Sequence, residues 1–180
     1  TNKGNPLEFP LKMPDGTTTK VDRTGEILEY FARKELDALV SVGGDGSLTI
    51  ANALHQKGLR VIGVPKTIDN DLDKTFTTFG FDTAVAFATE CIDRLHTTAD
   101  SHQRVMVVEV MGRYAGWIAL HAGIAGGAHA ILIPEIPFDL DKVAAKILDR
   151  DREGRMYSIV VVAEGAEPSH GQRAVLEPAE

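Results

Sequence analysis

The sequence predicts an α/β protein built on buried, mainly parallel strands. Short apolar runs alternate with helical patterns along the chain, as a parallel sheet with connecting helices requires. The predicted strands are continuous apolar runs and not polar/apolar alternations, so both faces of each strand are expected to be covered. Glycines and charged residues follow several strands directly, at the carboxyl ends where open α/β sheets bind ligands.

The first half of the chain contains two expected strands and two expected helices. After an irregular opening, residues 26–36 repeat apolar side chains about every 3.6 positions, which predicts a helix. Residues 37–42 (DALVSV) and 60–64 (RVIGV) are short, apolar and rich in valine, which predicts buried strands. Between them, residues 47–58 show a helical pattern that ends at Gly58.

The second half continues the alternation after the loop PKTIDNDLDKTFTTFG. A long helical pattern covers 81–99, and RVMVVEV (104–110) predicts a strand. A further helix over 117–127 stops at a pair of glycines. The last expected elements are a strand at 128–133, an amphipathic helix at 139–154 and a strand at 158–165.

Charge and cysteine content exclude several classes of protein. The net charge of −7 argues against nucleic-acid and anionic-membrane partners, which bind basic surfaces. Small phosphorylated ligands are still possible, because they need only a few well-placed cations. No apolar run reaches the roughly 18 residues of a membrane span. The single cysteine, Cys91, cannot form an intrachain disulfide, which favours a reducing, cytoplasmic location.

GGDGS (43–47) joins the first strand to a helix. Glycines let the backbone approach a ligand, and the helix N-terminus beyond them offers N–H groups to a phosphate. Asp45 suits such a site when a divalent cation accompanies the phosphate, since Mg²⁺ takes carboxylate and phosphate oxygens together. The alternative is a tight turn in which Ser47 caps the helix.

PKTIDND (65–71) places two acids at the end of the second strand. In an extended loop, Asp69 and Asp71 project to the same side, where their charges repel unless they serve a purpose. One carboxylate could accept a proton from a substrate hydroxyl while the other helps to hold a metal. Lys66 and Thr67 could contact phosphate oxygens. The alternative is an Asn-Asp turn capped by its own side chains.

The remaining charged candidates lie around the strands at 104–110 and 158–165. Arg113, in MGR after the strand at 104–110, is placed to neutralise a phosphoryl group. Arg104 precedes the same strand, so it lies at the opposite end and cannot share that site within one subunit. Each arginine is also compatible with an ordinary surface position. Glu164 is placed to accept a sugar hydroxyl or to be a solvated charge at a strand end.

These motifs together resemble the 6-phosphofructokinase family. GGDGS, PKTIDND, SHQR, MGRYAG, AGG and AEG occur in the family's order from about residue 1 to about residue 165. TIDND together with MGR is highly specific, whereas GGDGS alone is not. The resemblance implies three-layer, Rossmann-like parallel sheets and parts of two similar domains, a phosphate-donor domain over 1–79 and a sugar-phosphate domain over 80–180.

The resemblance also implies transfer of the terminal phosphoryl group of ATP to the 1-hydroxyl of fructose 6-phosphate, a step of glycolysis. Asp69 resembles the general base, with Thr67 and Asp71 as its neighbours in the sugar and metal site, and Arg113 resembles the cation that steadies the transferring group. Asp45 resembles the acid associated with Mg²⁺. The other implied contacts are the donor loop, Gly44, Gly46 and Ser47, a basic residue near the donor phosphates, Lys3, and the sugar contacts, Met111, Gly112 and Glu164.

Arg104 resembles the arginine that reaches the sugar 6-phosphate of an adjacent subunit. This role agrees with its place at the far end of the strand and implies a homodimer or homotetramer with shared active sites. The family's segments before Thr1 and its C-terminal segment are absent from the sequence. We therefore expect a fragment that exposes sheet edges and apolar surface and is poorly soluble by itself.

Two positions bear on the phosphoryl donor. Pyrophosphate-dependent relatives usually carry aspartate in place of Gly46 and lysine at the position of Lys66, whereas many bacterial ATP-dependent members carry glycine at both. Gly46 leaves room for ATP, and Lys66 adds a cation useful for pyrophosphate. ATP is the expected donor and pyrophosphate the alternative. Two further alternatives are a non-catalytic subunit that binds sugar phosphate and a lipid or NAD kinase, which also uses a GGDG turn but would lack TIDND and MGR.

Overall fold

The computed structural model describes residues 7–170, and the chain divides into two compact units with the boundary in the sequence between Lys66 and Thr67. The sequence analysis places its boundary between Phe79 and Gly80 instead. Residues 67–80 group with the second unit, and within this segment the hydroxyl of Thr78 donates a hydrogen bond to the carbonyl oxygen of Thr67. Among the described helices, none combines the length with the apolar character that a membrane span needs.

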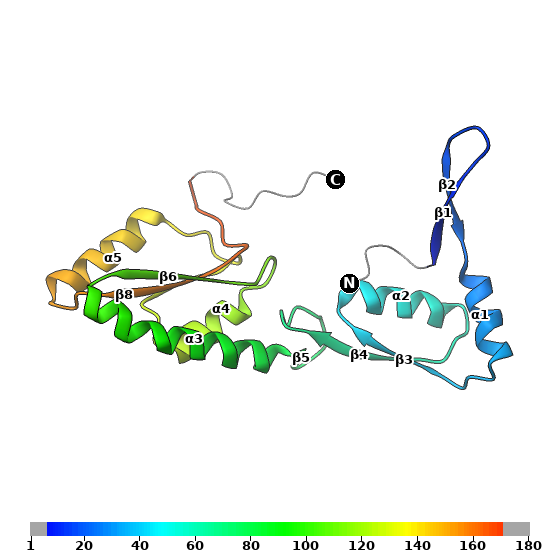
Figure 1. Cartoon of the computed structure of the whole chain (residues 1–180), viewed down its shortest axis with the longest axis horizontal. Coiled ribbons are helices and arrows are strands. Elements are labelled where there is room, and N and C mark those ends of the chain that lie inside the picture. The colour runs from blue at the N-terminus through cyan, green and yellow to red at the C-terminus, as the bar shows by residue number, and fades with distance from the viewer. Residues whose placement is uncertain (1–6, 171–180) are drawn as a thin grey trace. The chain divides into compact units, whose positions relative to one another are not determined.

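The first unit opens with a β-hairpin, where the sequence analysis expects irregular structure (Figure 1). Strands β1 (Glu8–Lys12) and β2 (Thr18–Asp22) pair antiparallel around a turn in which Gly16 has a φ of +84°. Asp15 and Gly16 form an Asp-Gly turn signal. The expectation was wrong because both strands are exposed and neither contains an apolar run as long as those by which the buried strands were identified.

A parallel pair of strands with its connecting helix completes the first unit. Strand β3 (Leu39–Gly43) pairs with β4 (Val61–Thr67), from Leu39 opposite Val61 to Gly43 opposite Pro65. Helices α1 (Thr24–Arg33) and α2 (Asp45–Gln56) precede and connect the two strands. Leu7, Leu54 and Leu59 form the buried core, and side chains from both helices and both strands pack against it.

The second unit is a parallel sheet in the strand order β6-β8-β7. Figure 1 shows helices α3 and α4 on one side of the β6–β8 ribbon and α5 on the other. The sheet runs parallel throughout, as predicted, and the α/β fold class is confirmed. Besides the two-residue strand β5 (Phe79–Gly80), which lies outside this sheet, the unit contains α3 (Phe81–His102), β6 (Val105–Val110), α4 (Trp117–Ala125), β7 (Ala130–Leu132), α5 (Leu140–Arg152) and β8 (Ser158–Ala163).

The core of the second unit lies between the sheet and helices α3 and α4. Ile92 of α3 and Ile159 and Val161 of β8 are fully buried there. Each such side chain stabilises the fold by roughly 1.5–3 kcal/mol through burial of apolar surface. Gly126, after α4, makes this approach possible, because a Cβ at that position would lie 2.7 Å from Cγ2 of Ile92. The parallel pairing of β6 with β8 sets their carboxyl ends opposite each other, with Val110 facing Ala163.

Candidate functional site

Strand β4 continues past its apolar run and ends at Thr67, three residues beyond the predicted end. Thr67 is therefore the last residue of β4, and the loop that contains Asp69 and Asp71 begins directly after it. Its carbonyl oxygen accepts a hydrogen bond from the hydroxyl of Thr78 at 2.8 Å. The amide N–H of Thr78 in turn donates to Oδ1 of Asn70 at 3.0 Å.

The loop is not extended at its centre, so the premise from which Asp69 and Asp71 were expected to project to the same side does not hold. Asn70 has a φ of +53°, in the left-handed region, which asparagine tolerates better than most residues. The turn leaves Asp69 half-buried and Asp71 exposed. The two carboxylates consequently have different surroundings and can take different roles.

Asp69 combines partial burial with an unused hydrogen-bonding atom. Its backbone N–H donates to the hydroxyl oxygen of Thr67 at 3.2 Å, and that hydroxyl lies 3.5 Å from Oδ2 of Asp69. Its other oxygen, Oδ1, is buried and accepts no hydrogen bond from the residues that the structure describes. Because a buried oxygen without a partner is costly, this atom is a strong candidate to receive a proton from a ligand.

Nearby charges act on Asp69 in the same direction as burial. Burial raises the pKa of Asp69 above its ordinary value, the negative charges of Asp71 and Glu164 raise the pKa further, and the hydrogen bond with Thr67 opposes them. Glu164 belongs to the turn after β8, so the structure brings two of the predicted motifs together. A carboxylate with a raised pKa is a better proton acceptor than an ordinary aspartate.

The MGR loop after β6 packs directly on the turn that carries Glu164. The N–H of Gly165 donates to the carbonyl oxygen of Gly112 at 3.1 Å, and Gly112 has a φ of +143°. A Cβ at position 165 would lie 2.0 Å from the carbonyl oxygen of Arg113, so only glycine fits. Arg113 and its neighbour Met111 are both exposed, and the Arg113 guanidinium carbon lies 5.3 Å from the centre of the Tyr114 ring.

Sequence reasoning assigned no role to Glu135, which follows β7. Its Oε1 accepts a hydrogen bond from the N–H of Gly116 at 2.8 Å. Gly116 is the N-cap residue of α4, and no side chain of its own caps the helix. Glu135 therefore ties the end of the MGRYAG segment to the loop after β7. The notable signal in the sequence is its position after a strand in PEIP.

Arg104 lies where the sequence analysis places it, at the end of β6 opposite to Arg113. It precedes Val105, and its carbonyl oxygen accepts a hydrogen bond from the N–H of Ser158, at the start of β8, at 3.3 Å. Its side chain is exposed. Within this chain's second unit, Arg104 does not join the cluster around Asp69.

The GGDGS turn of the first unit begins helix α2 earlier than expected. Gly44 is the N-cap with no side-chain cap, and the helix starts at Asp45, so Ser47 lies in the first turn and is not the cap. Gly43 is required by packing, because a Cβ there would lie 2.4 Å from Cβ of Ser47. Gly46 has no such reason: a Cβ there would meet nothing within 4 Å.

The remaining donor-side candidates have little structural context. Lys66 is an exposed residue near the end of β4, and Lys3 lies outside the described residues. No group of three or more metal-binding side chains occurs within residues 7–170. Asp45 of the first unit and Asp71 of the second are both exposed. Each by itself is compatible with Mg²⁺, since this ion is often held by a single carboxylate together with substrate phosphates.

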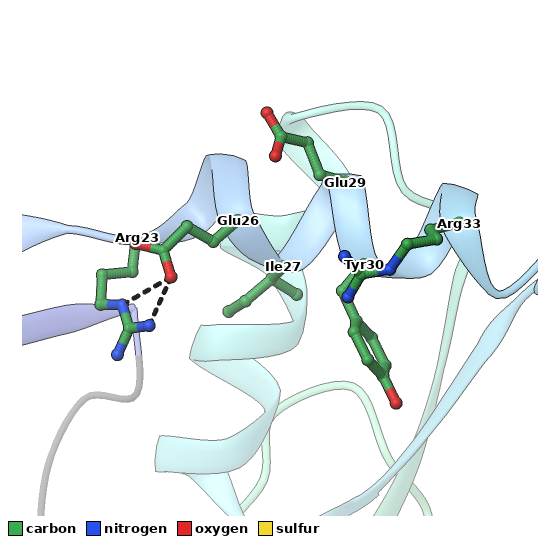
Figure 2. A pocket seen from close by; sticks show the side chains of 6 residues that line it. All are labelled: Arg23, Glu26, Ile27, Glu29, Tyr30 and Arg33. Atoms are coloured by element: carbon green, nitrogen blue, oxygen red, sulfur yellow. Dashed lines mark hydrogen bonds and ion pairs between the residues drawn. The ribbon is translucent and has the colours of Figure 1, made fainter.

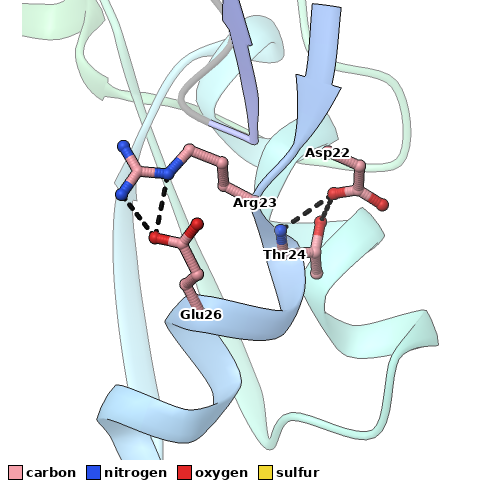
Figure 3. A network of polar contacts seen from close by, with 4 residues as sticks. All are labelled: Asp22, Arg23, Thr24 and Glu26. Atoms are coloured by element: carbon pink, nitrogen blue, oxygen red, sulfur yellow. Dashed lines mark hydrogen bonds and ion pairs between the residues drawn. The ribbon is translucent and has the colours of Figure 1, made fainter.

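A surface hollow of about 530 Å³ lies along α1, away from the predicted residues (Figure 2). Its lining mixes charges of both signs with apolar side chains, namely Arg23, Glu26, Ile27, Glu29, Tyr30 and Arg33. Arg23 forms an ion pair with Glu26, and Oδ1 of Asp22 accepts the N–H of Thr24 at 2.8 Å (Figure 3). These contacts fix the chain at the start of α1, whose N-cap residue, Arg23, makes no side-chain cap hydrogen bond.

Comparison with known proteins identifies the family. The family described as phosphofructokinase matches residues 11–178. The chain is 65% identical over 171 residues to an ATP-dependent 6-phosphofructokinase of Chloroflexus aurantiacus, a match that covers 95% of this chain and 47% of the relative. It is 51% identical over 175 residues to ATP-dependent 6-phosphofructokinase 2 of Clostridium perfringens, covering 97% of this chain and 48% of the relative. The chain spans about half the length of these curated relatives.

Solved structures agree with the sequence comparison. A phosphofructokinase of Saccharomyces cerevisiae superposes with a TM-score of 0.69 at 36% identity, covering 77% of this chain and 22% of that chain. A pyrophosphate-dependent phosphofructokinase of Marinobacter aquaeolei superposes with a TM-score of 0.70 at 31% identity, covering 81% and 41%. With the strand-end motifs in the family's order and the family match across most of its length, the chain belongs to the phosphofructokinase family.

Proposed function

We propose that the full-length protein transfers the terminal phosphoryl group of ATP to the 1-hydroxyl of fructose 6-phosphate, giving fructose 1,6-bisphosphate. The observation that carries the proposal is Asp69, a half-buried carboxylate with one oxygen free of hydrogen bonds in the described structure. It stands beside Glu164 at the carboxyl ends of the strands, in a chain of the phosphofructokinase family.

Asp69 takes the proton of the sugar 1-hydroxyl as that oxygen attacks the phosphoryl group. Its raised pKa supports this role, since a base works best when its pKa approaches the working pH. Thr67 and Asp71 frame the base on either side. Arg113, which follows the carboxyl end of β6, supplies positive charge to the transferring group. Positioning and charge carry most of the rate in such reactions, because little covalent work is required of the protein.

Sugar and donor contacts complete the proposal. Met111, Gly112 and Glu164 hold the fructose ring, and Arg104 binds the 6-phosphate in an adjacent subunit, which requires at least a homodimer. Lys3, Lys66 and the turn formed by Gly44, Gly46 and Ser47 serve the donor phosphates. Asp45 and Asp71 are the candidate carboxylates for Mg²⁺, which when bound with the donor would neutralise charge on its phosphates.

Gly46 favours ATP as the donor. Gly46 lies in the first turn of α2, and a Cβ there would meet nothing within 4 Å, so packing does not require a glycine at this position. Room for a ligand explains why a glycine stands there. Relatives named ATP-dependent, at 51% and 65% identity, support the same donor. Lys66 and the similarity to pyrophosphate-dependent structures keep pyrophosphate as the second candidate.

The test is an assay of the full-length protein with fructose 6-phosphate and, separately, MgATP or Mg-pyrophosphate. We expect turnover with ATP. Turnover with pyrophosphate alone would overturn the donor assignment. Binding of fructose 6-phosphate without turnover on either donor would indicate a non-catalytic subunit. In the same assay, Asp69→Ser is expected to lower kcat by about two orders of magnitude or more, since general bases contribute 10²–10⁴-fold, with little change in sugar affinity.

A further inference from the structure

We propose that Thr78 is a positioning residue for this reaction, which holds the backbone on both sides of Asp69. The inference rests on the proposed function, because it gives Thr78 its purpose through the base. Thr78 itself does not touch the reacting atoms. It stands at the far end of the acidic loop, immediately before β5.

Two hydrogen bonds from one buried residue span the base. Thr78 is 2% exposed. Its hydroxyl donates to the carbonyl oxygen of Thr67, two residues before Asp69, at 2.8 Å. Its amide donates to the side chain of Asn70, the residue after Asp69, at 3.0 Å. The loop is therefore fastened on either side of the base by a residue that solvent does not reach.

The backbone conformation of Asn70 explains why the loop needs the hydrogen bonds from Thr78. Its left-handed backbone, with a φ of +53°, is an unfavourable conformation for a residue with a Cβ. The side-chain bond to Thr78 compensates for that conformation. The turn at Asn70 is also what separates the surroundings of Asp69 from those of Asp71, so the contact to Thr78 helps to decide which acid is half-buried.

Repulsion acts against this arrangement. Asp71 and Glu164 both raise the pKa of Asp69, which means that three negative groups lie close enough to oppose one another. A loop without internal fastening would relax by moving Asp69 towards solvent, where its charge is screened. Thr78 prevents this movement because it is tied to the end of β4 through Thr67.

The experiment uses Thr78→Val in the full-length protein, because valine keeps the shape and the amide N–H but removes the hydroxyl donor. Thr78→Ser retains that donor and serves as the rescue variant. Thr75→Val is the matched control: the Thr75 hydroxyl donates to the carbonyl oxygen of Leu72 at 2.7 Å, in the same loop but without a contact to the residues that flank Asp69.

We expect Thr78→Val to lower kcat by about tenfold to a hundredfold, the loss that follows from a displacement of about 1 Å in a catalytic group. The KM for fructose 6-phosphate should change by less than about threefold, because the sugar contacts remain. Thr78→Ser and Thr75→Val should remain within about threefold of the parent.

An unchanged kcat in Thr78→Val, or an equal loss in Thr75→Val, would overturn the proposal. Should Thr78→Val fail to fold, Asn70→Gly tests the other bond, because glycine tolerates the left-handed backbone and removes the side chain that carries the acceptor oxygen. That variant is expected to lose kcat in the same range with KM preserved, and full activity would contradict the inference.

Amide hydrogen exchange separates this inference from the proposed function, because it does not depend on turnover. In Thr78→Val, the amides of residues 69–71 and 78 should exchange at least about threefold faster than in the parent, whereas Thr75→Val should leave them unchanged. If the parent protein shows no kinase activity but the exchange rates behave in this way, the proposed function fails while the fastening by Thr78 stands. Unchanged exchange in Thr78→Val would refute the fastening itself.

Discussion

At the scale of single residues, Asp69 shows a conflict between stability and function. Its burial and its acidic neighbours raise the pKa in the folded protein, so the unfolded chain loses this proton at a lower pH than the folded protein does. The resulting stabilisation is fully present below the unfolded pKa, near 3.8, and is lost as pH rises through the folded pKa. At neutral pH the ionised Asp69 therefore weakens the fold.

Asp69→Asn is accordingly expected to raise the melting temperature at neutral pH, because the amide removes the buried charge and its repulsion from Asp71 and Glu164. The gain should shrink as the pH is lowered through the carboxyl range, where the parent carboxylate also becomes neutral. Thermal unfolding at several pH values measures it, with Asp93→Asn on the exposed face of α3 as the control. If Asp69→Asn were less stable than the parent at neutral pH, the conclusion that the Asp69 carboxylate destabilises the fold would be wrong.

The sequence predicted the acids of this site but not the residues that hold them. Asp69 and Glu164 follow apolar strands. A charge at such a position is costly unless it serves a purpose, so the sequence pattern alone predicted these two residues as candidates for the functional site. Thr78 bonds to a residue 11 positions earlier and Glu135 to one 19 positions earlier. Residues so far apart in the sequence come into contact only when the loops fold back on the strand ends. A threonine or glutamate in a loop carries no local signal of such a contact.

At the scale of secondary-structure elements, helix α4 depends on a neighbouring loop for its start. Its N-cap is glycine, and the carboxylate of Glu135 supplies the acceptor that the cap lacks. Glu135→Ala is expected to destabilise the protein by about 0.5–2 kcal/mol, the range for loss of a helix cap. Glu135→Gln keeps an acceptor oxygen and should recover most of that loss.

Urea unfolding at a fixed pH measures the free energy of unfolding of each variant. The informative quantity is the loss in Glu135→Gln relative to the loss in Glu135→Ala. Equal destabilisation by Ala and Gln would show that the negative charge at the helix N-terminus matters more than the hydrogen bond. No loss in either variant would show that the start of α4 needs no acceptor from Glu135.

The order and type of the later elements were predictable, because their apolar periodicity is strong. The errors lie where hydrogen bonding and not apolar burial defines an element. Strand β4 extends through Lys66 and Thr67, beyond the apolar run, and α2 starts at Asp45 although the apolar pattern begins later. The exposed hairpin of β1 and β2 was missed for the same reason, since its pairing depends on backbone bonds around Gly16.

At the scale of the whole chain, the strands differ in how far they are covered. Strand β8 is buried along nearly its whole length, as its continuous apolar run predicts. The β3–β4 pair does not meet that expectation: one face packs on the core around Leu54, whereas Val40, Val42 and Ile62 on the other face are 57%, 57% and 59% exposed. Apolar strands exposed in this way are unusual for a parallel sheet, which is normally covered on both faces.

This exposed face predicts how the 180-residue chain behaves by itself. Contiguous apolar surface on a sheet promotes association, so we expect sedimentation velocity to show larger species as the concentration rises. Replacing Val40, Val42 and Ile62 together with threonine keeps β-branched side chains and strand propensity while reducing the apolar surface, and should shift the chain towards monomer without lowering its melting temperature. Ile136→Thr, at an equally exposed loop position, is the control and should leave association unchanged. If the triple variant associates as strongly as the parent, the outer face of β3 and β4 is not the surface responsible.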